Sequence, residues 1–148
     1  MSQPKPIRLI AQDGPDLEVI SAAVQDAVTQ IGNLSFSARQ RRFSIELNRF
    51  VWERPSNPPL RVRALLAFDS VLGVQVRGLP QGDPDLVVSL LQVRFEPGAA
   101  APEGRVVLLF AGDGEIALRV EALDATLLDS GVQWPTRSVP GHDDRKRR

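Results

Sequence analysis

The chain has 148 residues, of which 43% are hydrophobic and 24% charged, and its 18 basic and 18 acidic residues leave no net charge. This composition is typical of one folded domain and excludes a disordered polypeptide. The lack of cysteine excludes disulfides, thiolate catalysis, and zinc–thiolate or iron–sulfur centres. Apolar runs are far shorter than the roughly 20 residues of a membrane helix. The first residues lack the apolar core of a secretory signal. We therefore expect a cytoplasmic protein without a membrane partner.

The N-terminal segment predicts a short strand followed by a helix. Residues 7–11 are typical of a strand. Asp13 is a candidate helix N-cap, and Pro15 suits the first turn. Apolar residues then recur with a helical period at Leu17, Ile20, Val24, Ala27 or Val28, and Ile31. Gly32 predicts the end of this helix.

Between Leu34 and Val120 the apolar period changes to two, which predicts antiparallel strands. Phe43 and Phe50 fall on opposite parities, so we expect a bulge near Asn48 that brings both to one face. Segments rich in proline and glycine predict loops at residues 54–59, 78–85 and 97–104. The run Gly112-Asp113-Gly114 predicts a tight hairpin turn rather than a phosphate loop, because both flanking segments alternate.

Residues 121–130 return to a longer period and predict a short C-terminal helix that Gly131 ends. The predicted fold class is α+β. We expect an antiparallel meander sheet of about seven strands, curled or partly closed into a barrel, with one helix after the first strand and a second at the end. This layout resembles the pleckstrin-homology barrel, a likeness that carries no function. Residues 6–131 are expected to form one domain, and residues 132–148 an extended to disordered tail.

The sequence holds few groups that could run catalysis. His142 is the only histidine, and it lies in the predicted tail, so we expect no histidine-based active site, no metal site and no cofactor. Glu53 or Glu96 could act as a base in a small carboxylate/arginine enzyme acting on an anionic metabolite. The competing interpretation places these carboxylates in cross-strand ion pairs.

The most suggestive feature is the arginine content, since only Lys5 and Lys146 among the 18 basic residues are lysines. The strand positions predicted to face away from the core include Arg61, Arg63, Arg77, Arg94 and Arg119. Such a basic sheet face could bind a phosphate-bearing ligand or an acidic protein surface. Solubilising ion pairs and a GC-rich genome are the alternative explanations. Few aromatic residues interleave with the arginines, which argues against nucleic acid.

We predict two sets of site residues. The candidates for ligand binding are Arg49, Arg61, Arg63, Arg77 and Arg94. Trp52 and Trp134 are the candidates for contact with a partner, because large aromatic side chains often anchor interfaces.

Several motifs together resemble a known family. They are residues 16–21 (DLEVIS), 48–53 (NRFVWE), 93–96 (VRFE) and 110–116 (FAGDGEI), with Trp134 and His142 near the end. In combination they are similar to a bacterial family of short proteins known only as a domain of unknown function, over residues 7–142. The resemblance implies a housekeeping role in the bacterial cytoplasm and brings no activity, cofactor or catalytic residue.

The sequence therefore favours a non-enzymatic cytoplasmic binding or accessory module, in which a basic sheet face contacts an anionic ligand or an acidic protein surface. A small carboxylate/arginine enzyme is one alternative, and a structural homo-oligomer built through an exposed sheet edge is another. A binding module predicts open arginines, whereas an enzyme predicts a desolvated glutamate beside an arginine in a cleft.

Overall fold

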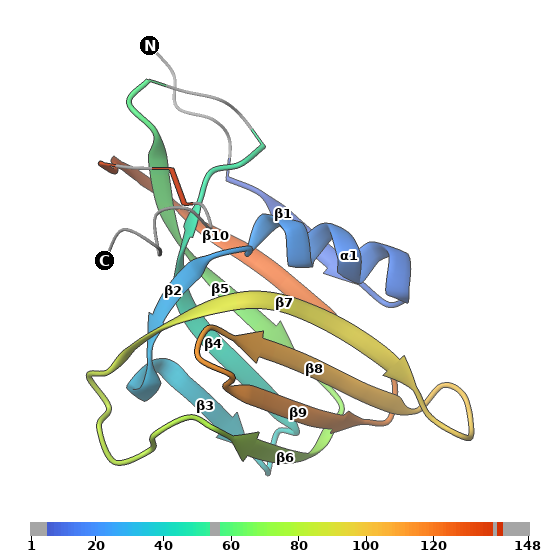
Figure 1. Cartoon of the computed structure of the whole chain (residues 1–148). Helices are drawn as coiled ribbons and strands as arrows, with labels where there is room; N and C mark the ends of the chain where they lie inside the picture. Colours follow the sequence, from blue (N-terminus) through green and yellow to red (C-terminus); the bar gives the residue numbers. More distant parts are fainter. Residues whose placement is uncertain (1–5, 54–56, 138, 141–148) are drawn as a thin grey trace.

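The computed structural model describes residues 6–53, 57–137 and 139–140, and in these it forms one ten-stranded antiparallel sheet, a 3-10 helix and one α-helix (Figure 1). The elements are β1 (Arg8–Ala11), α1 (Gly14–Ala23), β2 (Ala27–Gln30), η1 (Ile31–Asn33), β3 (Leu34–Ser37), β4 (Arg42–Phe50), β5 (Leu60–Phe68), β6 (Val71–Arg77), β7 (Val87–Pro97), β8 (Gly104–Phe110), β9 (Glu115–Val120) and β10 (Ala125–Pro135). The broad α+β class is therefore confirmed, with ten strands in place of about seven.

The strand order is β1-β10-β5-β4-β2-β7-β8-β9-β6, and β3 pairs with β4 beside this path. The predicted hairpins β3–β4, β4–β5, β7–β8 and β8–β9 are present. The sheet is nevertheless no simple meander, because β10 lies between β1 and β5 and β2 lies between β4 and β7. It is also not closed into a barrel, since β1 and β6 end the path.

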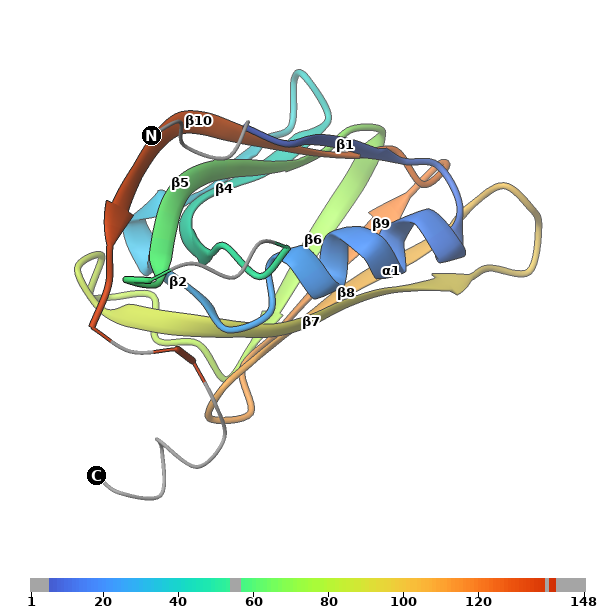
Figure 2. The ribbon, with the colours of Figure 1, turned by 90° about the horizontal axis from the view of Figure 1, so that it is seen from above.

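The sheet curls so that its two halves face each other across the core. Figure 2 shows β1, β10, β5 and β4 on one side and β7 and β8 on the other, with α1 between β1 and β7. The strand β2 connects the halves: it pairs with β7 over four residues but with β4 only through Val28 and Asn48.

The start of α1 follows from local chemistry. Asp13 is the N-cap, and its carboxylate accepts a hydrogen bond of 2.9 Å from the backbone N–H of Asp16. Proline in the first turn needs no hydrogen-bond partner for its nitrogen. Leu17 and Ile20 are buried between the helix and the sheet.

The helix ends at Ala23, so the prediction that it continues to Gly32 is wrong. Asp26 has a φ of 60°, which breaks the helix, and β2 follows at once. Ala27 and Thr29 alternate with more exposed neighbours along β2 and are buried. The apolar residues of this segment fit both the helical period and the period of two that is typical of a strand. Pairing with β7 favours the strand.

The predicted C-terminal helix over residues 121–130 is also wrong, because Ala125–Pro135 is the long strand β10. Pairing on both sides, with β1 and with β5, outweighs the local helical spacing. Gly131, with a φ of 91°, lies within the register shift between Asp129 and Gln133 rather than at a helix end. The strand continues four residues past the expected start of the tail, whereas His142 lies outside the described residues.

The bulge expected near Asn48 is absent, since β4 and β5 keep an unbroken register from Phe43 to Phe50. Phe43 and Leu47 point into the core on β4, and Arg49 takes the next inward position. The register shifts occur instead in β6, β7 and β10. The parity change in the sequence thus marks a buried charge and not an extra residue.

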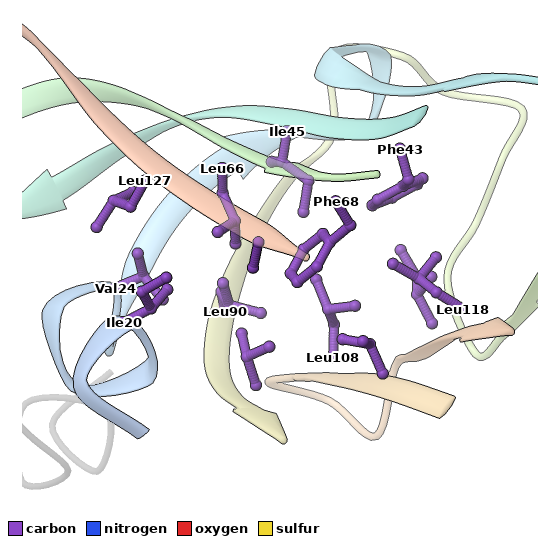
Figure 3. Packing of buried hydrophobic residues seen from close by; sticks show 14 of the residues in the cluster. Ile20, Val24, Phe43, Ile45, Leu66, Phe68, Leu90, Leu108, Leu118 and Leu127 are labelled. Carbon is purple, nitrogen blue, oxygen red and sulfur yellow. The ribbon is translucent and has the colours of Figure 1, made fainter. Parts of the chain in front are cut away.

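The core lies between the two halves of the sheet and one face of α1. Figure 3 shows Ile20 and Val24 from the helical side, Ile45, Leu66 and Phe68 from one half, and Leu90, Leu108 and Leu118 from the other. Among the described residues no helix has both the length and the apolar character needed to cross a membrane.

The close packing of β7 against β8 can be tested at Gly104. A Cβ atom there would lie 2.5 Å from Cζ of Phe95 and 2.6 Å from the carbonyl oxygen of Glu96. We expect Gly104→Ala to lower the free energy of unfolding by about 1–3 kcal/mol, measured by chemical denaturation. Gly82→Ala is the matched control, because nothing lies within 4 Å of its Cβ position. Equal stability of the two variants would contradict this packing.

Candidate functional site

The arginines expected to share one basic face lie in three environments. Arg49 is buried inside the sheet. Arg61 and Arg63 lie on β5, on the side opposite its buried residues. Arg77 and Arg94 lie on β6 and β7, in the other half of the molecule. The structure therefore brings these residues together on no common face.

Arg49 has 0% of its surface exposed, and all five N–H groups of its guanidinium have an acceptor. Nε and Nη2 each donate to the Asp129 carboxylate at 2.8 Å. Nη1 and Nη2 donate to Glu53 at 2.9 and 2.7 Å, and Nη1 also donates to the Phe50 carbonyl oxygen at 3.2 Å. Asp129 additionally accepts from the N–H of Ile7 at 3.0 Å. We call Arg49, Glu53 and Asp129 the buried cluster after its buried pair, Arg49 and Asp129, whereas the side chain of Glu53 is 38% exposed.

The ionisation of the buried cluster is fixed by these contacts. Burial by itself lowers the pKa of Arg49, but hydrogen bonds from its guanidinium to Asp129 and Glu53 raise that pKa overall. Burial by itself raises the pKa of Glu53, and the hydrogen bonds from Arg49 outweigh it, so the pKa of Glu53 is lowered. A carboxylate held ionised in this way is a poor proton acceptor, and the cluster serves to stabilise the fold.

The predicted partner contacts, Trp52 and Trp134, are both half-buried. Nε1–H of Trp52 donates to the carbonyl oxygen of Gln25 at 3.1 Å, and its ring centroid lies 4.7 Å from that of Phe50. Trp134 lies on β10 opposite Arg61. Trp52 therefore ties the segment after β4 to the residues just past α1, and Trp134 lies beside the first residues of β5.

The other predicted arginines are engaged to different degrees. Nη1 of Arg61 donates to the Asn48 carbonyl oxygen at 3.2 Å, and burial lowers the pKa of Arg61. Arg63 lies 3.5 Å from Glu46, and Arg77 lies 2.6 Å from Glu115. These contacts match the ion-pair interpretation of the sequence pattern.

A row of charged residues crosses the outer face of β7, β8, β9 and β6. The strand register places Glu96 opposite Arg105, Arg105 opposite Arg119, and Arg119 opposite Gly73. All four line one groove of about 670 Å³. We call it the arginine groove.

Glu96 holds two arginines in place beside the groove. Its Oε1 accepts from Nε and Nη2 of Arg105 at 3.1 and 2.8 Å, and its Oε2 accepts from Nε and Nη2 of Arg94 at 3.2 and 3.0 Å. The hydrogen bonds from Arg105 and Arg94 lower the pKa of Glu96. Within the described residues Arg119 makes no hydrogen bond or ion pair, although it lies directly across from the like charge of Arg105.

The floor of the groove is made of small residues. Gly73 has no side chain, and a Cβ there would lie 3.5 Å from Nη2 of Arg119, so this guanidinium lies over the glycine. Ala117, two residues before Arg119 on β9, is 6% exposed, and its partner on β8, Val107, is 0% exposed. Glu103 lies at the rim. Arg105 and Arg119 both line this groove, and their guanidinium groups could donate charge-assisted hydrogen bonds to an oxyanion in it.

Sequence reasoning named Arg94 and Glu96 and placed Arg119 in the basic series, but it missed Arg105. The available signal was parity, since Arg105 precedes the buried alternation of Val106, Leu108 and Phe110. In the described part of the chain no three acidic, histidine or cysteine side chains lie close enough to hold a metal ion.

The family model described as "Protein of unknown function (DUF2948)" matches residues 7–142. No curated protein and no solved structure matches the chain.

The buried cluster predicts a large effect at Arg49. Replacing it in Arg49→Met leaves Asp129 buried without its counter-charge, and we expect a loss of about 3–5 kcal/mol in the free energy of unfolding. Arg63→Met is the control, because this exposed side chain has one ion pair with Glu46, of a kind that contributes at most about 1 kcal/mol. Chemical denaturation measures both, and similar losses would contradict the assignment.

The lowered pKa of Glu53 predicts a dependence of stability on pH. A carboxyl group whose pKa is lower in the folded state stabilises the fold above its unfolded pKa, about 4.3, and this contribution disappears as pH falls through the folded pKa. The difference in unfolding free energy between the wild type and Glu53→Gln should therefore shrink between pH 7 and pH 3. A constant difference would show that Glu53 does not titrate with folding.

Proposed function

This chain belongs to the DUF2948 family, and we propose that it is a binding module whose arginine groove holds an anionic group, a carboxylate or a phosphate. The observation that carries this proposal is the position of Arg119. It lies opposite Arg105 and over Gly73, and it has no partner among the described residues. Like charges directly opposite each other on a sheet are unfavourable, so an anion between them would relieve the repulsion.

The hydrogen-bond donors of the groove are already oriented. Glu96 binds the Nε and Nη2 edge of Arg105, which leaves Nη1 of Arg105 without a partner in the described chain. Arg119 offers its whole guanidinium. Arg105, which Glu96 holds in place, loses little further rotational freedom when it binds an oxyanion.

The groove also supports a ligand larger than a bare ion. Its volume of about 670 Å³ is in the range of small-molecule sites. Leu72 and Val74 line it beside the arginines, so an anionic group attached to an apolar body would match both parts. A metabolite or an acidic side chain on a protein surface has this chemistry.

The enzyme alternative has less support. Both carboxylates considered as bases, Glu53 and Glu96, have lowered pKa values and two or more hydrogen bonds from arginines. A general base needs a pKa near the working pH, which calls for the opposite shift. The bacterial and cytoplasmic assignments stay predictions.

The proposal predicts that Arg119→Gln weakens anion binding about tenfold or more, because one charge-assisted contact is lost. Isothermal titration calorimetry with inorganic phosphate and, separately, with an oligoglutamate peptide measures the affinity, at low and at high salt. We expect binding to weaken in high salt. Binding of phosphate alone indicates a small metabolite, and binding of the peptide alone indicates an acidic protein surface.

Arg8→Gln is the matched control, because Arg8 is also exposed and without a partner in the described chain but lies on β1, in the other half. It should bind both probes like the wild type. Equal affinities of the two variants, or no binding of either probe by the wild type, would end the proposal.

A further inference from the structure

Three strands of the described sheet, β1, β3 and β6, pair with only one neighbour, and two of them border an uncovered groove. β3 pairs only with β4, and β6 pairs only with β9. Figure 1 shows these two strands near each other, and no backbone hydrogen bond joins them in the described part of the chain. A groove of about 340 Å³ runs between them. We call it the β3–β6 seam.

Both ends of the seam are tied by the chain itself. At one end the N–H of Val71 donates to the carbonyl oxygen of Arg41 at 2.9 Å. At the other end the N–H of Gly32 donates to the carbonyl oxygen of Pro84 at 2.8 Å. β3 runs from the Pro84 end toward the Arg41 end, and β6 runs the opposite way. The seam therefore has a defined length and two distinct ends.

The walls of the seam are apolar and incompletely covered. Leu34 on β3 and Val74 and Val76 on β6 pack against the core but stay half-exposed. Phe36 is 38% exposed, and all four line the groove with Leu79 and Ile116. Within the described chain no strand lies over these side chains, so they would gain buried surface from an added one.

The two ends differ in charge. The turn between β3 and β4 carries Arg39, which has no partner within the described residues. The loop at the Pro84 end carries Asp83 and Asp85, and no described cation pairs with either. An occupant that complements both ends must carry an acidic residue near Arg39 and a basic residue near Asp83 and Asp85.

We propose that the β3–β6 seam binds an extended segment of a partner protein, which adds a strand to the free edge of β6. β6 offers seven residues where β3 offers four, so it gives the longer ladder. Strand addition uses main-chain hydrogen bonds for affinity and alternate side chains for specificity. The inward side chains of the segment are apolar and lie against Leu34 and Val76. The segment runs antiparallel to β6, so its N-terminal end lies near Asp83 and Asp85 and carries the basic residue.

A short capped peptide tests this proposal. In its sequence valine alternates with threonine, a lysine stands at the N-terminal end to face Asp83 and Asp85, and a glutamate stands at the C-terminal end to face Arg39. Hydrogen–deuterium exchange of the full chain should slow in β6 as this peptide is added, with saturation. The same peptide with its two charges exchanged should protect β6 less. Val76→Lys should weaken the effect, whereas Val19→Lys, at an exposed position of α1, should not.

Three results would overturn the proposal. The first is no protection of β6, or protection in other strands only. The second is equal protection by both peptides, which would remove the role of the charged ends. The third is slower exchange in β6 with rising protein concentration and no peptide, which would assign the seam to a second copy of this chain. The seam and the arginine groove share the lining residue Val74, but none of these three results involves Arg105 or Arg119.

Discussion

The buried guanidinium of Arg49 imposes the strongest constraint on this fold. A charge of this size is tolerated inside a protein only where every donor has an acceptor and a counter-charge is close. Asp129 meets that need from β10, and Glu53 from the segment after β4. The strand β10 must therefore enter the sheet beside β5, and Asp129 also holds Ile7, the residue just before β1. One side chain thus holds together strands from both ends of the sequence.

The two halves of the sheet use the same residue type in opposite ways. In the half that contains β10, the donors of Arg49 are fully matched inside the sheet. In the other half, Glu96 matches Arg94 and Arg105 while Arg119 stays without a partner in the described chain. Stability accounts for the first arrangement, and the anion-binding proposal rests on the second. Composition alone cannot separate them, because the difference lies in strand register.

Period-two alternation predicted most of the strands from β3 to β9, turn residues predicted the hairpin at Gly112, and the cap at Asp13 with Pro15 predicted the start of α1. It failed where residues fit two periods at once. Residues 24–31 have apolar positions for either a helix or a strand, and pairing with β7 decides between them. In β10 a buried, inward position is held by the acid Asp129. The sequence alone suggests an outward position for this residue, because it does not show that Asp129 pairs with Arg49. Arg105 and Arg119 face each other across the predicted β8–β9 hairpin, but the sequence does not show that β6 lies beside β9 and places Gly73 opposite Arg119, so the site was only partly predictable.

The connection through β2 has a mechanical consequence. Val28 and Asn48 are the sole residue pair between β2 and β4, where every other pairing of the sheet has at least four, and the hydroxyl of Thr29 adds one bond of 2.6 Å to the Glu46 carbonyl oxygen. The backbone ladder of the sheet is therefore weakest between β2 and β4. The halves are held together there mainly by the apolar core that they share, in which Ile45 and Leu66 from one half lie in the same cluster as Leu108 and Leu118 from the other.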